Sequence, residues 1–394
     1  MAEKKLSAAE QRKQQQARRE REKKRLELQR RRRRKVLVLR AVLALVCVLG
    51  LVLILAGVTG TFRKDGAEAA RSADGNTGEG ETMTEVPASE VRHFSFPTLL
   101  ADESRSGEET SALTVEQFRQ ILEDLYRRGY ILVDIHDLAE ENEDGTLRQA
   151  SIRVPEGKIP FVLSQRDVSY PFDKAGSGYA SRLVVDEDGK LENEYVQADG
   201  TAVTGDYDVV PCLESFLEEH PDFSLNGARG ILGLTGYNGI LGYRTSQELG
   251  KSAAEGNPYA ETYGTYDTAQ EAEACGTVVQ ALKEAGWSFA SYGYDYVSYG
   301  SESSLMQADA EQWETEVEPL VGETDILIFP WQTDLGSFSS YGTENEKYTY
   351  LRGLGFRYFC IDTEDSCFVQ VGDDYVHQGI REIDSMQEYT ELMQ

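Results

Sequence analysis

Charge is distributed unevenly along the 394 residues, which argues against one globular domain for the whole chain. The first 40 residues carry 17 Lys and Arg against 5 Asp and Glu, whereas the remaining 354 carry 23 basic and 63 acidic side chains. Such an asymmetry is typical of a chain that occupies two compartments. The net charge near −40 of the longer part argues against anionic polymers, nucleic acid or teichoic acid, as its main ligand.

A basic tail, residues 1–35, lies directly before an apolar run. The run from Val36 to Val58 is interrupted only by Arg40 and is long enough to span a bilayer. The basic residues before it predict one transmembrane helix at 36–58 with a cytoplasmic N-terminus and a tail attracted to anionic lipid rather than nucleic acid. A cleaved signal peptide is the main alternative, but the charged leader is long and the stretch 56–60 is a poor cleavage site.

Residues 59–91 are rich in acidic and small side chains and contain few large apolar ones, and this composition predicts a flexible linker. One extracytoplasmic domain is expected at 92–394. Among the cysteines, Cys360 and Cys367 flank a short acidic turn, and whether they form a disulfide stays open.

Helical and strand patterns alternate through residues 92–394. Thr114-Val115-Glu116-Gln117 has the spacing of a capping box, and Gly129 follows where that helix would end. Further helices are expected at 210–219, 269–285, 310–320 and 344–354, and strands at 130–135, 159–163, 230–234, 287–290, 326–329 and 358–361. This alternation predicts an α/β fold with a parallel sheet, open or closed into a barrel, whose chemistry lies on the loops after the strands.

The stretch from His93-Phe94-Ser95-Phe96-Pro97-Thr98 to Tyr375-Val376-His377-Gln378-Gly379 resembles the polysaccharide deacetylases, also called the NodB homology domain. The resemblance implies a distorted (β/α) barrel, here preceded by a single transmembrane helix. It also implies removal of acetyl groups from sugar polymers with one divalent metal, usually zinc. Such a site needs three ligands and an open position, so that the metal polarises the carbonyl and activates water.

The metal-site positions of that family are replaced in this chain. In Leu163-Ser164-Gln165-Arg166-Asp167, Asp167 matches a metal ligand, but Arg166 stands at the position of the general base, and a guanidinium does not accept a proton. In Ser291-Tyr292-Gly293-Tyr294-Asp295-Tyr296, Tyr292 and Tyr296 stand at the two histidine positions, and a phenol is a poor zinc ligand at neutral pH. The sequence therefore predicts that the zinc site is lost, with no catalytic or metal-binding residue assigned.

Two interpretations of the remaining residues stay open. Arg166 pairs with Asp167 in the pocket or points to solvent, and the match of His377 to the family's late acid is weak. Tyrosines 170, 292, 294 and 296 form an aromatic floor for sugar rings with Trp331, or they are ordinary packing. The predicted groove is lined by Arg166, Asp167, Tyr292, Asp295, Tyr296, Pro330 and Trp331.

These patterns predict a membrane-anchored cell-surface domain of the deacetylase type that binds cell-envelope glycan or acts there as an interaction module, without metal-dependent hydrolysis. An active carbohydrate deacetylase with a rebuilt site is the first alternative, and a structural envelope protein is the second. The sequence does not predict the oligomeric state.

Overall fold

A ring of parallel strands organises the computed structural model, which describes residues 82–106, 111–336, 340–363 and 367–394. Within these residues, seven strands close on themselves in the order β11-β12-β13-β14-β16-β2-β7, because β7 also pairs with β11. They are β2 (Arg92–Phe96), β7 (Ile159–Gln165), β11 (Ile231–Leu234), β12 (Ser288–Ser291), β13 (Ile326–Ile328), β14 (Tyr358–Asp362) and β16 (Val376–Glu382). This ring is the closed form of the parallel sheet that the sequence predicts.

Shorter strands lie outside the seven-stranded ring. Strand β3 (Tyr130–Leu132) runs parallel to β7, and β15 (Val369–Val371) runs antiparallel to β16. The others form separate antiparallel sheets: β1 (Met83–Pro87) with β6 (Ser151–Pro155), β4 (Ala139–Glu141) with β5 (Leu147–Gln149), and β8 (Arg182–Val185), β9 (Leu191–Val196) and β10 (Ala202–Gly205) together. The last sheet is an insertion between β7 and the next helix.

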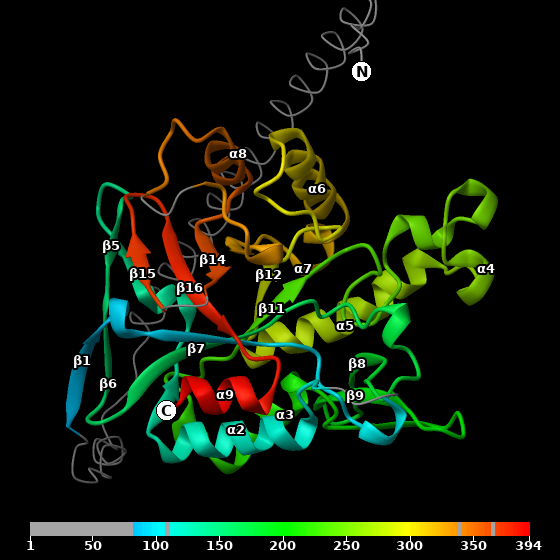
Figure 1. Ribbon diagram of the computed structural model, residues 1–394, viewed down its shortest axis with the longest axis horizontal. Coiled ribbons are helices and arrows are strands. Elements are labelled where there is room, and N and C mark those ends of the chain that lie inside the picture. The colour runs from blue at the N-terminus through cyan, green and yellow to red at the C-terminus, as the bar shows by residue number, and fades with distance from the viewer. Residues whose placement is uncertain (1–81, 107–110, 337–339, 364–366) are drawn as a thin grey trace, which may run out of the picture. The chain divides into compact units, whose positions relative to one another are not determined.

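Helices occupy most of the connections between barrel strands. These helices are α2 (Val115–Arg127), α3 (Val209–Glu219), α4 (Ala260–Tyr263), α5 (Thr268–Ala285), α6 (Ser303–Glu316), α7 (Glu318–Val321) and α8 (Glu346–Leu354). A further helix, α9 (Met386–Leu392), follows the last barrel strand. Figure 1 shows α2, α3 and α9 together on one side of the strands, with α6 and α8 on another. The predicted capping box is present, because Thr114 and Gln117 exchange side-chain and backbone hydrogen bonds at the start of α2.

Several predicted boundaries were wrong. The folded unit begins inside the expected linker, because β1 pairs with β6 along its whole length. The helix expected at 310–320 begins at Ser303 and ends at Glu316, and α7 with Pro319 in its first turn follows; proline lacks the amide that would continue a helix. The sequence analysis did not predict strand β16, because the polar residues His377 and Gln378 interrupt its apolar pattern.

Alternation along each strand separates two cores. Phe161 and Leu163 of β7 pack with the helices α2 and α3, whereas Val162 lies in a second cluster inside the barrel. Strand β2 follows the same period, so that Phe94 and Phe96 face the helices and the residues between them face inward. Near each strand end, the position of a residue in this alternation therefore decides whether its side chain faces the barrel interior or the helices.

The barrel interior is not wholly apolar. His93 is fully buried there, and its ring nitrogens hydrogen-bond Gln378 Oε1 at 2.9 Å and Ser164 Oγ at 2.9 Å. Burial lowers the pKa of His93 to about 4, so the imidazole is neutral. His93 thus joins β16 to β7 across β2, the strand between them.

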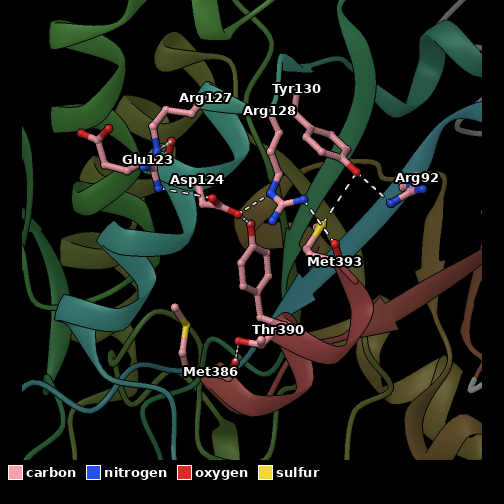
Figure 2. Close-up of polar contacts among 10 residues, drawn as sticks. Arg92, Glu123, Asp124, Arg127, Arg128, Tyr130, Met386, Thr390 and Met393 are labelled. Atoms are coloured by element: carbon pink, nitrogen blue, oxygen red, sulfur yellow. Dashed lines mark hydrogen bonds and ion pairs between the residues drawn. The ribbon is translucent and has the colours of Figure 1, made fainter.

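The C-terminal helix α9 is fixed to α2 by polar contacts (Figure 2). The Asp124 carboxylate of α2 accepts hydrogen bonds from Tyr389 at 2.8 Å and from Arg128, whose guanidinium also donates to the Met393 carbonyl at 3.2 Å. Helix α9 directly follows β16, and these contacts therefore hold the segment that leaves the last barrel strand.

Two expectations concern the cysteines and the membrane helix. Cys360 and Cys367 are free thiols, and Cys360 is buried in the cluster inside the barrel. No helix among residues 82–106, 111–336, 340–363 and 367–394 has the length and apolar character to cross a bilayer. The helix predicted at 36–58 and the linker up to residue 81 lie outside the described residues.

A charged histidine gives the fold a testable pH dependence. His136 hydrogen-bonds Asp134 Oδ1 at 2.7 Å and Asp325 Oδ1 at 3.1 Å. Burial alone would lower the pKa of His136, but these hydrogen bonds outweigh it and raise the pKa to about 10. Stabilisation by the imidazolium is thus complete below a pH near 6.5 and is lost as the pH rises through about 10.

We expect His136→Gln to lower the free energy of unfolding by about 1 kcal/mol at neutral pH, a modest value because solvent screens this partly exposed group. The difference from wild type should shrink towards the alkaline end of a urea-unfolding series. Asp325→Asn should reduce the same pH dependence. An equal loss at both ends of the series would contradict this role of His136.

Candidate functional site

The barrel mouth, defined here as the residues that follow the C-terminal ends of the seven strands, is the candidate site. Because all seven strands are parallel, these ends lie together. Side-chain and backbone contacts join the neighbouring loops: Thr235 Oγ1 donates to Asp167 Oδ1 at 2.6 Å, Gly236 N donates to the Tyr294 carbonyl at 2.9 Å, and Trp331 Nε1 donates to the Tyr296 carbonyl. The predicted residues after β7, β12 and β13 therefore share one continuous rim.

Asp167 is held as an oriented carboxylate. Its Oδ1 accepts hydrogen bonds from Ser169 at 2.8 Å and Thr235 at 2.6 Å. Burial raises the pKa of Asp167, although these two hydroxyls oppose the rise. Its backbone φ of 50° lies in the left-handed region, which turns the side chain towards β11 and away from the direction of Arg166.

Arg166 does not pair with Asp167, and it does not point to solvent. Its guanidinium forms ion pairs with Asp384 and with Glu382 Oε1 at 3.5 Å, and it donates to the Ser95 carbonyl at 3.2 Å. Arg166 extends the inward alternation of β7, with 10% of its side chain exposed. Neither of the two open interpretations of Arg166 holds, because Arg166 continues the inward face of β7 whereas the left-handed backbone of Asp167 turns its side chain towards Thr235.

The acids that pair with Arg166 were missed by the sequence analysis. Glu382 ends β16, and its amide donates to Asp362 Oδ1 at 3.1 Å at the end of β14. Burial raises the pKa of Glu382 to about 7 even though Arg166 opposes the shift. A period-2 pattern through Val376, Gln378 and Ile380 that ends in an acid is the signal that would have found it.

Three aromatic side chains run in contact along the rim. The rings of Tyr292 and Tyr296 meet edge to face at 5.1 Å, and those of Tyr296 and Trp331 do so at 5.5 Å. Trp331 is 63% exposed, whereas Tyr292 is buried. Both Tyr296 (φ 56°) and Trp331 (φ 61°) have left-handed backbone, a conformation that costs free energy for a non-glycine residue.

The loop that carries these tyrosines is anchored from below by a residue that the sequence did not single out. Asp309 of α6 is buried, and its carboxylate accepts hydrogen bonds from the amides of Tyr294 at 2.9 Å and Asp295 at 2.8 Å and from the Tyr299 hydroxyl at 3.1 Å. Asp309 therefore fixes the path of the loop after β12. The Asp295 side chain itself is exposed at the rim.

Two tyrosines expected in the aromatic floor lie elsewhere. The Tyr170 hydroxyl donates to buried Asp208 at 2.7 Å, and the Tyr294 hydroxyl contacts Ser246 at 2.9 Å; both rings belong to the helix-side core. Pro330 is buried beneath Trp331. The packing interpretation thus holds for Tyr170 and Tyr294, and His377 also faces away from the mouth, against Asp334 at 3.6 Å.

The residues at the family's metal positions do not fit zinc. The Tyr296 hydroxyl donates to the Tyr292 hydroxyl at 3.3 Å, so the two phenols are engaged with each other. Burial raises the pKa of Tyr296 to about 12 and holds the pKa of Tyr292 well above its ordinary value, which keeps both protonated at neutral pH. Zinc sites are built from thiolate, imidazole and carboxylate groups, and no cluster of three or more such groups suited to a metal is present in the described part of the chain.

The buried ion pair of the mouth gives a direct prediction. Arg166→Gln leaves Glu382 buried without its counter-charge, and we expect the free energy of unfolding to fall by about 3 kcal/mol. The pKa of Glu382 should rise further in the variant, so that the loss grows as the pH of the unfolding measurement rises through about 7.

The double variant Arg166→Gln/Glu382→Gln removes both charges and should recover most of that loss. Arg148→Gln is the matched control, because its pair with Glu140 is exposed and should contribute less than about 0.5 kcal/mol. A loss in Arg166→Gln no larger than that of the control would contradict the buried pair.

Comparison with solved structures finds polysaccharide deacetylases. The Streptococcus pyogenes deacetylase PplD, solved in complex with acetate, is similar with a TM-score of 0.41 and 9% identity, over 79% of this chain and 100% of its own. Polysaccharide deacetylases from Bacillus anthracis (described as putative) and Bacillus cereus give TM-scores of 0.40 and 0.41, each at 8% identity over 79% of this chain and 70% of theirs. No protein-family model matches the chain, and no curated protein matches it.

Proposed function

We propose that this chain binds cell-envelope glycan at the barrel mouth, as a membrane-anchored extracytoplasmic domain of the deacetylase type without metal-dependent hydrolysis. The observation that carries the proposal is Trp331, a largely exposed indole on a left-handed backbone. Its Nε1 bonds the Tyr296 carbonyl, so its ring is held in one orientation. An exposed, immobilised aromatic face is suited to the apolar face of a sugar ring, and strained backbone is concentrated at functional sites.

The absence of hydrolysis rests on the chemistry of the rim. Arg166 cannot act as a base, and its charge is taken up by Glu382 and Asp384. The protonated phenols of Tyr292 and Tyr296 offer no anionic ligand. Membrane anchoring rests on the apolar run 36–58 and on the charge asymmetry of the sequence.

A hydrolase with a rebuilt site is the second candidate, favoured by one feature. A carboxyl group that titrates near pH 7, as Glu382 does, has the pKa that a general acid or base needs at neutral pH. In this case Glu382 would move the proton and the rim aromatics would hold the sugar.

Binding is tested by calorimetry with oligosaccharides prepared from peptidoglycan and chitin. Trp331→Ala should weaken binding about 10-fold, because truncating a central aromatic contact commonly costs 1 to 2 kcal/mol or more. Trp331→Phe should keep most of the affinity, since it retains an aromatic face. Ile159→Ala is the matched control: Ile159 is 38% exposed and begins β7, at the opposite end of the barrel.

Hydrolysis is tested by metal content and acetate release on the same purified protein. We expect less than stoichiometric zinc and no acetate from acetylated chitooligosaccharide. Stoichiometric zinc with acetate release would overturn the proposal. Acetate release that persists with chelator and disappears in Glu382→Gln would favour the second candidate.

A further inference from the structure

The carboxylates of the mouth exceed its cations. Asp167, Asp295, Asp362, Glu382 and Asp384 all follow or end barrel strands. Arg166 pairs with Glu382 and Asp384, and Arg381, whose guanidinium donates to the Thr363 carbonyl at 2.8 Å, acts on Asp362. Because Arg166 is shared by Glu382 and Asp384, it does not neutralise the other acids. Lys174 acts on Asp167 only at longer range, with its ammonium over the Tyr179 ring at 4.6 Å.

Asp167 presents one free carboxylate oxygen beside the aromatic rim. Both of its described hydrogen bonds use Oδ1, and Oδ2 makes none within the described residues. The Asp167 charge contributes to the raised pKa of Tyr296, which places the carboxylate within electrostatic range of that ring. An acceptor and the aromatic side chains therefore belong to the same rim.

The floor of the mouth holds a further unsatisfied group. Ser95 is fully buried, lies on the inward face of β2 between β16 and β7, and its Oγ has no hydrogen-bond partner in the described structure. The Arg166 guanidinium donates to the Ser95 carbonyl directly above it. Buried polar atoms are normally satisfied, and an unsatisfied one beneath a rim points to a polar group or water supplied when the site is filled.

We propose that the mouth selects glycans with free amino groups, the de-N-acetylated hexosamines, over N-acetylated or anionic ones. This inference rests on the proposed glycan-binding function and names its ligand class. A sugar ammonium would donate a charge-assisted hydrogen bond to Asp167 Oδ2 and would be attracted by the aromatic faces of Tyr296 and Trp331. A neutral acetamide can donate one N–H to the carboxylate, but it makes no ion pair and no cation–π contact. Uronate or phosphate groups would be repelled by the surplus carboxylates.

The test compares glucosamine and N-acetylglucosamine oligomers of the same length by calorimetry, at about pH 6 and at two salt concentrations. We expect wild type to bind the glucosamine oligomer at least about 10-fold more tightly. Asp167→Asn keeps the shape of the side chain and should abolish that preference, because the affinity for the glucosamine oligomer falls most. Trp331→Ala should weaken both.

Overall negative charge alone would also attract a cationic oligomer, so a matched charge control is needed. Asp222→Asn removes one negative charge from the segment just before β11, at the end of the barrel opposite the mouth. A preference that survives Asp167→Asn, or that Asp222→Asn reduces equally, would overturn the inference.

The remaining outcomes separate this inference from the proposed function. Equal or tighter binding of the N-acetylated oligomer, still weakened by Trp331→Ala, would overturn the amine preference and leave the glycan-binding function in place. Binding of neither oligomer would overturn both.

Discussion

The pairing of β7 with β11 is the constraint on which the site depends. It closes seven parallel strands into a ring, and closure brings loops that are far apart in sequence to one end. The register of the pairing also decides which side chains face the interior, because alternate residues of a strand point to opposite faces. Arg166 and Glu382, more than 200 residues apart, meet because β2 pairs with both β16 and β7 and both side chains face the interior.

The sequence was sufficient for the scaffold and for part of the rim. Apolar runs alternating with amphipathic helices predicted the parallel sheet, and the loops after β7, β12 and β13 were located by their motifs. Partners were not predictable in the same way. The neighbour of Arg166 in sequence is Asp167, but its neighbours in space come from β16, a strand whose inward face is partly polar and therefore lacks a clear apolar period.

Burial explains why the polar residues were harder to interpret than the apolar ones. In the sequence, Tyr170 and Tyr294 are as good candidates for the aromatic rim as Tyr292 and Tyr296. In the structure, however, the hydroxyls of Tyr170 and Tyr294 hydrogen-bond to residues of the helix-side core. Whether a tyrosine belongs to the rim, as Tyr292 and Tyr296 do, or to the helix-side core depends on the three-dimensional position of its hydrogen-bond partner, which one sequence does not contain. Asp309 shows the converse, since its role comes from the hydrogen bonds that its carboxylate accepts from the amides of Tyr294 and Asp295 and from the Tyr299 hydroxyl.

The place of β16 in the ring has a consequence for how the molecule assembles. β16 is the last barrel strand to be synthesised, and it lies between β14 and β2, the first. Until residue 382 has left the ribosome, β2 and β14 have open edges and Arg166 lacks its counter-charges. Such non-local closure slows folding and exposes strand edges to aggregation. A nascent chain of this type would depend on chaperones until its final residues arrive.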